Sequence, residues 1–227
     1  MGHFIDLNAA DGQIIPAYLA QPKGKPIGAV VVLQEIFGVN AHIRSVADGF
    51  ADAGYLTLAP ATFHRIKKGV ELGYSQDDMT AGFALKTAVE ELPLPGVMQD
   101  IQAAIDFASA AGQVAVLGFC WGGLLTWRSA CQLNGISAAV PYYGGGMTSE
   151  AEIARKPKCP VLAHFGDQDH WIPLPGVETF KSAHPEVQVH VYAANHGFNC
   201  DHRGSFDAPA AKLARERTLA FLAQHLT

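Results

Sequence analysis

Hydrophobic residues in this chain form short runs separated by amphipathic stretches, a pattern typical of alternating strands and helices. Residues 3–7 and 14–20 flank Ala10-Asp11-Gly12, which predicts an antiparallel β-hairpin with a glycine turn. Further along, short apolar runs predict strands at 28–33, 55–59, 114–117, 138–142, 161–165 and 187–192. The sequence therefore predicts about eight strands, the last six of them parallel.

Between these strands, helical periodicity predicts helices at 41–53, 95–110, 124–132, 149–155, 176–183 and 209–225. Asn40 is a suitable N-cap for the first helix, and Gly54 ends it. Each helix would cross over between parallel strands. The predicted fold class is therefore α/β, with an N-terminal antiparallel hairpin followed by a mostly parallel, doubly wound sheet. Ligands of such sheets bind beyond the carboxyl ends of the strands.

Residues 61–91 have weak periodicity and contain the polar runs Lys67-Lys68 and Gln76-Asp77-Asp78. This segment predicts a partly helical lid within the fold. Internal repeats and linker-like stretches are absent from the sequence, so residues 1–227 are predicted to form a single domain.

The composition favours a large core and a small ligand. Hydrophobic residues make up 49% of the chain and charged residues 16%, below the roughly 25% of typical globular proteins. The net charge of −5 leaves no basic face for nucleic acid or for an anionic membrane. We therefore expect a small-molecule substrate, no nucleic-acid or membrane partner, and a monomer or small homo-oligomer.

The sequence also predicts a cytoplasmic location. The segment from Met1 to Asp6 lacks a basic region followed by a long apolar run, so a secretory signal is not expected. No segment reaches the roughly 20 apolar residues of a membrane span. The four cysteines, at 120, 131, 159 and 200, show no paired spacing, which favours free thiols.

The most informative motif is Gly118-Phe119-Cys120-Trp121-Gly122-Gly123, between a predicted strand and a predicted helix. A strand that turns into a helix within two or three residues needs small neighbours, because a Cβ atom there would collide with adjoining backbone. This is the nucleophile elbow, in which the central residue stands at the tip of a strained turn. Cys120 occupies that position, and the following helix N-terminus would favour a thiolate and an oxyanion.

Two later strand ends supply the partners that a thiol nucleophile needs. Asp169 follows the predicted strand 161–165, and His196 follows the strand 187–192. The order nucleophile, acid, histidine is that of α/β-hydrolase triads. His196 would accept the thiol proton or stabilise the thiolate, and Asp169 would orient the imidazole.

Other residues leave alternatives open. Asp167 could orient the histidine in place of Asp169, although Asp169 lies further beyond the strand end and is preferred. His164 lies inside an apolar strand, which favours a structural role, and His170 remains undecided.

With these residues in place, the sequence resembles the dienelactone hydrolase family over nearly its whole length. The resemblance rests on Gln34-Glu35-Ile36-Phe37-Gly38-Val39-Asn40, Gly54-Tyr55 with Ala59-Pro60, the elbow, Tyr142-Tyr143-Gly144, Gly166-x-x-Asp169-His170 and His196-Gly197-Phe198. It implies an α/β-hydrolase fold, a Cys120-His196-Asp169 triad, hydrolysis of an ester or enol lactone, and no cofactor or metal.

The resemblance also implies roles that the pattern alone does not assign. Glu35 would lie beside the nucleophile and help switch it between resting and active states. The backbone N–H groups of Ile36 and Trp121 would form the oxyanion hole. Apart from the resemblance, the aromatic side chains of Phe37, Trp127, Tyr142 and Tyr143 are expected to supply walls for the substrate.

The chain departs from the family where a substrate carboxylate would bind. Family members that hydrolyse dienelactones use one arginine in the lid and another shortly after the catalytic histidine. Here residues 75–86 contain no arginine, and Cys200 stands four positions after His196. Arg65 and Arg203 lie outside the matching positions, so the sequence favours small neutral esters or lactones.

Two other classes compete with a thiol hydrolase. His196, Cys200, Asp201 and His202 are metal-ligand types close in sequence, which would suit a metal-dependent hydrolase, but their spacing matches no closed four-ligand pattern. A non-catalytic small-molecule binding protein on the same scaffold is the other alternative. Such a binder has no need for nucleophile, acid and base together.

Overall fold

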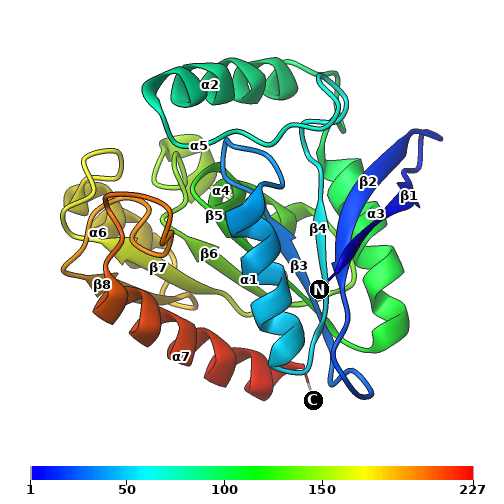
Figure 1. Ribbon diagram of the computed structural model, residues 1–227. Helices are drawn as coiled ribbons and strands as arrows, with labels where there is room; N and C mark the ends of the chain where they lie inside the picture. Colours follow the sequence, from blue (N-terminus) through cyan, green and yellow to red (C-terminus); the bar gives the residue numbers. More distant parts are fainter. Residues whose placement is uncertain (1, 227) are drawn as a thin grey trace.

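The computed structural model describes residues 2–226 and contains one eight-stranded sheet, shown in Figure 1. The strands are β1 (His3–Asn8), β2 (Ile14–Ala20), β3 (Ala29–Leu33), β4 (Leu56–Pro60), β5 (Val114–Phe119), β6 (Ile136–Tyr142), β7 (Leu162–Gly166) and β8 (Gln188–Tyr192). Their spatial order is β1-β2-β4-β3-β5-β6-β7-β8. β1 pairs antiparallel with β2, and β2 with β4, while the other neighbours are parallel. The predicted fold class is confirmed.

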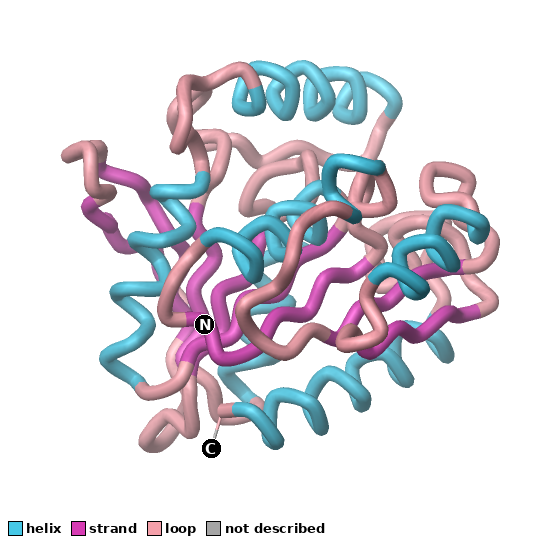
Figure 2. The backbone as a smooth tube through the Cα atoms, turned by 180° about the vertical axis from the view of Figure 1, so that it is seen from behind, coloured by secondary structure: helices cyan, strands magenta, loops and turns pink. Residues whose placement is uncertain are grey.

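The helices are α1 (Ala41–Asp52), α2 (Gln76–Glu90), α3 (Met98–Ala108), α4 (Trp121–Gln132), α5 (Glu150–Ile153), α6 (Leu174–Ala183) and α7 (Ala208–His225), with a 3₁₀ turn at Ser109–Ala111. α1 and α7 cover one face of the sheet, and α3, α4 and α6 cover the other (Figures 1 and 2). None of the helices within residues 2–226 is both long enough and apolar enough to cross a membrane.

The centre of the sheet forms the core. Every residue of β3 and β5 is buried, because helices cover both faces of these strands. Their carboxyl ends lead directly into the segments that contain Glu35 and Cys120. A rigid, fully buried pair of strands therefore positions the part of the molecule where the sequence predicts chemistry.

Two helices, α3 and α4, begin three residues away from the predicted positions. α3 begins at Met98 instead of Pro95, because Gly96 adopts a left-handed conformation with φ of 53° and the chain turns there. α4 begins at Trp121, three residues before the predicted start, because the elbow turns the strand directly into the helix.

The weakly periodic segment 61–91 contains α2, which lies above the carboxyl ends of the central strands (Figure 1). Ser75 and Asp78 form a capping box at its N-terminus, since each side chain bonds to the backbone of the other residue. Only Gly82 and Val89 of this helix are buried, which explains why its sequence has little amphipathic periodicity.

Candidate active site

Cys120 lies at the tip of a tight turn between β5 and α4, with φ of 55°. A left-handed conformation is uncommon for a residue other than glycine and marks a strained position. Neighbouring glycines make the turn possible. A Cβ atom on Gly118 would collide with the carbonyl oxygen of Gly122, and one on Gly122 would collide with the carbonyl oxygens of Leu33 and Gln34.

The Cys120 side chain is half-buried and lines a cavity of about 240 Å³. Much of the cavity wall is apolar, formed by Ile36, Phe37, Met79, Phe83, Trp121 and Trp171. His196, Lys86 and Arg203 supply its ionisable groups beside the thiol. The cavity thus combines a thiol, an imidazole and two cationic side chains in a largely apolar pocket suited to a small ligand.

His196 and Asp169 form a buried pair next to this cavity. Nδ1 of His196 lies 2.7 Å from Oδ2 of Asp169, whose side chain is fully buried. The other carboxylate oxygen accepts hydrogen bonds from the backbone N–H groups of Trp171, at 2.8 Å, and Ile172, at 3.2 Å. These bonds fix the carboxylate, which in turn fixes the orientation of the imidazole.

The charge state of His196 depends on its neighbours. Burial lowers its pKa, but the Cys120 thiolate and the hydrogen-bonded Asp169 carboxylate outweigh burial and raise it to about 10. The imidazole is therefore protonated at neutral pH when Cys120 is a thiolate.

Three other candidates near the strand ends lie outside the His196–Asp169 pair: Asp167, His164 and His170. Asp167 is exposed, and its backbone N–H donates to the carbonyl oxygen of Tyr192 at 2.9 Å. His164 is fully buried, with Nδ1 2.8 Å from the Tyr192 hydroxyl and Nε2 3.0 Å from the Thr218 hydroxyl. His170 is exposed.

Glu35 follows β3 and is almost completely buried. Its Oε1 accepts a hydrogen bond from Nη1 of Arg203 at 3.2 Å, and Oε2 accepts one from the Tyr74 hydroxyl at 3.4 Å. The Arg203 guanidinium also lies 5.7 Å from the centre of the Phe37 ring. Glu35 is thus a buried carboxylate paired with a cation on the cavity wall.

Arg203 lies in the candidate site, although its position in the sequence did not predict this. It lies seven residues after His196, and the loop between them brings it back over Glu35. Lys86 of α2 reaches the same cavity. Arg65 is elsewhere, because it forms ion pairs with Asp100 and Asp11. The predicted preference for neutral substrates rested on the absence of arginine from the two family positions, yet Arg203 lines the cavity from a different position.

Three of the four predicted aromatic wall residues lie elsewhere, and this corrects the expected walls. Phe37 lines the cavity. Trp127 instead packs against Phe180, with its Nε1 donating to the Glu152 carbonyl oxygen at 3.1 Å. The Tyr142 hydroxyl lies 2.6 Å from that of Thr218 on α7. Tyr143 is buried behind the imidazole, its ring centre 5.1 Å from that of His196.

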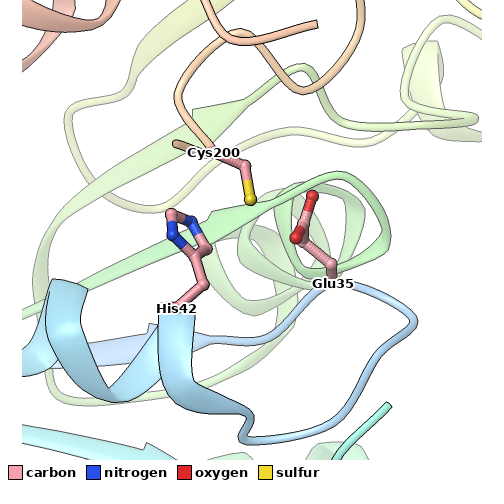
Figure 3. Close-up of side chains that lie close together, drawn as sticks. All are labelled: Glu35, His42 and Cys200. Atoms are coloured by element: carbon pink, nitrogen blue, oxygen red, sulfur yellow. The ribbon is translucent and has the colours of Figure 1, made fainter. Parts of the chain in front are cut away.

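The residues of the alternative metal cluster separate in space. His196 pairs with Asp169, while Cys200 lies beside Glu35 and His42, as Figure 3 shows. His202 and Asp201 form a second group with His42. Burial raises the pKa of the Cys200 thiol to about 12 and lowers that of His42. The alternative cluster suggested by sequence proximity, with His196 as a member, is therefore not brought together.

Comparisons with known proteins agree with this architecture. A Pyrococcus furiosus esterase of 15% sequence identity superposes with a TM-score of 0.70 over 100% of this chain and 94% of its own, which indicates a shared fold. The fold is that of the α/β-hydrolases.

The family follows from closer matches. The model of the dienelactone hydrolase family matches residues 15–226. Carboxymethylenebutenolidase from Pseudomonas putida is 34% identical over 227 residues, covering 96% of this chain and 95% of its own. A candidate dienelactone hydrolase from Klebsiella pneumoniae superposes with a TM-score of 0.84 at 31% identity, covering 99% and 98% of the two chains. The chain belongs to the dienelactone hydrolase family and is a carboxylic ester or lactone hydrolase.

Proposed function

We propose that this hydrolase cleaves a small ester or enol lactone through a covalent acyl intermediate on Cys120. The Cys120 thiolate attacks the carbonyl carbon, and the tetrahedral intermediate then expels the alkoxide or enolate, which takes a proton from the His196 imidazolium. In the second step His196 accepts a proton from water as the water attacks the thioester. The second tetrahedral intermediate expels the Cys120 thiolate as the C–S bond breaks, which releases the acid and restores the thiolate with a protonated His196.

The negative oxygen of each tetrahedral intermediate needs donors at a fixed place. Ile36 and Trp121 both line the cavity beside Cys120, and Trp121 is the first residue of α4. The N–H groups in the first turn of a helix have no acceptor within the helix, so that of Trp121 can donate to an oxyanion. We assign the oxyanion hole to the backbone N–H groups of these two residues.

The substrate class that this cavity favours is a small ester or lactone with a carboxylate group. A carboxylate leaving water needs a charged partner, and a guanidinium provides the best-matched one. Arg203 uses Nη1 for Glu35, and its guanidinium has further N–H donors for a substrate carboxylate. Lys86 of α2 lines the same cavity, and its Nζ lies 2.7 Å from Oε2 of Glu90, so a substrate carboxylate would share this cation with Glu90. A carboxylated dienelactone fits this chemistry.

One observation carries the proposal: a strained, half-buried Cys120 shares a cavity with a histidine whose other nitrogen is 2.7 Å from a buried aspartate. The test is rapid quenching with a chromogenic acetate ester, followed by intact-protein mass spectrometry. An acetyl group should appear on Cys120 before steady state. Cys120→Ala should lose both the adduct and turnover, by about 10⁴-fold or more.

Cys159→Ala is the matched control, since this half-buried thiol lies outside the cavity lining. It should retain turnover and form the adduct normally. An acetyl group on another side chain, or full activity in Cys120→Ala, would contradict the proposed nucleophile.

A further inference from the structure

Three buried side chains from separate segments converge beside the proposed active site (Figure 3). Glu35 lies in the loop after β3, His42 in the first turn of α1, and Cys200 in the loop after β8. One ligand atom from each lies within 4.8 Å of the others, and all three residues are buried. Carboxylate, imidazole and thiolate are together the ligand set that zinc prefers.

The orientation of His42 supports a metal ligand over simple core packing. Its Nδ1 lies 3.2 Å from Oδ1 of Asp201. An ionised carboxylate can only accept, so Nδ1 donates, and the lone pair of a neutral imidazole is then on Nε2. That nitrogen is buried and has no hydrogen-bond partner among residues 2–226. Metal-binding histidines commonly donate their second nitrogen to a carboxylate in this way.

Neither His42 nor Cys200 has a task in the proposed hydrolytic cycle. Cys200 is completely buried, and His42 is 3% exposed. A buried acceptor without a partner destabilises a fold, whereas apolar side chains of similar size would not. The presence of an unpaired acceptor, a thiol and a carboxylate at one place therefore needs an explanation other than packing.

We infer that His42, Cys200 and Glu35 form a binding site for a divalent cation of the zinc class, separate from the nucleophile. The ligand atoms would be Nε2 of His42, Sγ of Cys200 and one carboxylate oxygen of Glu35. On binding, the Cys200 S–H proton passes to solvent as the metal-sulfur bond forms, and the cation loses water molecules. Three protein ligands leave one position of a tetrahedron for water.

Binding of a zinc-class ion places requirements on the spacing of the three ligand atoms and on their total charge. Tetrahedral zinc with ordinary bond lengths has its ligand atoms about 3.3–3.6 Å apart. The three groups lie within 4.8 Å, so small side-chain rotations must draw them inward. Arg203 already neutralises Glu35 at Oε1, so the Cys200 thiolate provides the balancing negative charge for the cation.

A bound cation would cross-link the loop after β3, the start of α1 and the loop after β8. The last of these loops also contains His196 and Arg203. Because an ion that binds only the folded state stabilises it, the midpoint of thermal unfolding should rise with metal concentration.

The experiment uses the full chain with Cys120→Ala as background, so that Cys120 and His196 cannot together hold a metal. Zn²⁺ binding is measured by calorimetry, and Co²⁺ binding by the thiolate-to-cobalt absorption band. We expect one ion per chain and a thermal midpoint that rises with added Zn²⁺. Adding Cys200→Ser or His42→Gln should weaken binding by at least the ~10–100-fold that loss of an outer-shell partner costs, and Cys200→Ser should abolish the band.

Matched controls are Cys131→Ser and His202→Gln, added singly to the same background. Both should bind the ion normally, and circular dichroism verifies that every metal-free variant is folded. Loss of binding in His202→Gln but not in Cys200→Ser would assign the ion to His42, Asp201 and His202 and overturn the inference. So would the absence of Zn²⁺ and Co²⁺ binding in the folded background protein. Neither result would bear on the Cys120 mechanism.

Discussion

Arg203 and Glu35 are 168 positions apart in the sequence, yet Nη1 of one donates to Oε1 of the other at 3.2 Å. Both side chains are largely removed from water, with 16% and 1% of their surfaces exposed. A carboxylated substrate bound by the remaining N–H donors of Arg203 would share this guanidinium with Glu35. The shared cation would then connect substrate binding to the position of the buried Glu35 carboxylate.

Replacing this arginine should separate two kinds of substrate. In Arg203→Gln, kcat/KM for a carboxylated dienelactone should fall tenfold or more, about 1.4 kcal/mol of transition-state stabilisation. A small neutral ester has no group for the guanidinium, so its kcat/KM should change little. Steady-state rates with both substrates on one preparation provide the measurement.

Arg155→Gln is a suitable control because Arg155 pairs with Glu152 on α5, and Arg128 also contacts that carboxylate. It should leave both rates unchanged. An equal loss with both substrates in Arg203→Gln would show that the arginine acts through Glu35 and not on the substrate carboxylate.

Replacing each of the two aspartates after β7 by asparagine should have very different effects on turnover. Asp169→Asn places an amide against Nδ1 of His196, which disturbs the tautomer, so turnover should fall by a factor on the order of 10⁴. Asp167→Asn should change turnover by less than about twofold, since this side chain is exposed and only its backbone bonds to the neighbouring strand. The ratio of the two kcat values is the measurement, and the opposite ranking would move the orienting role to Asp167.

Alkylation at neutral pH should select Cys120. Burial raises the pKa of Cys131 to about 12, of Cys159 to about 11 and of Cys200 to about 12. At pH 7 a thiol with a pKa near 11 is ionised in about one molecule in 10,000, and only the thiolate reacts with iodoacetamide. Peptide mapping after brief labelling should therefore find the modification on Cys120 alone. Similar labelling of all four thiols would exclude an activated site.

Stability should depend on pH through His196. Its pKa is raised from 6.5 to about 10 in the folded protein, so the folded state binds the proton more tightly than the unfolded chain. The resulting stabilisation is fully present below pH 6.5 and is lost as pH rises to about 10. Denaturant titrations of wild type and His196→Gln across that range should show their difference in unfolding free energy shrinking with pH. A difference that stays constant would contradict the ion pair.

The parts of the site that sequence could predict are those fixed by backbone constraints. The elbow needs glycine at 118 and 122 because backbone carbonyls occupy the space of a Cβ atom. Asp169 and His196 follow strands whose apolar runs are clear, so their place at one edge of the sheet follows from parallel pairing.

Side chains whose direction depends on tertiary packing could not be placed in this way. Trp127 is six residues after Trp121 on α4, which is roughly 240° around the helix, so the two indoles face different surroundings. Tyr142 and Tyr143 are adjacent, but the hydroxyl of Tyr142 reaches Thr218 whereas the ring of Tyr143, a residue with φ of 35°, packs against His196. Arg203 reaches Glu35 only because of the loop that follows His196, and no local pattern encodes that path.

The packing of main chain against main chain at Gly122 has a chemical consequence for the nucleophile. The location of residue 120 is set by glycine contacts with Gly118, Leu33 and Gln34, and none of these contacts involves sulfur. The backbone therefore fixes where the side chain of residue 120 lies and from which direction it can approach a substrate. It does not fix whether the attacking atom is oxygen or sulfur. Oxygen and sulfur are interchangeable as far as the architecture is concerned, and the choice between them is decided by the proton acceptor and the charges that surround that point.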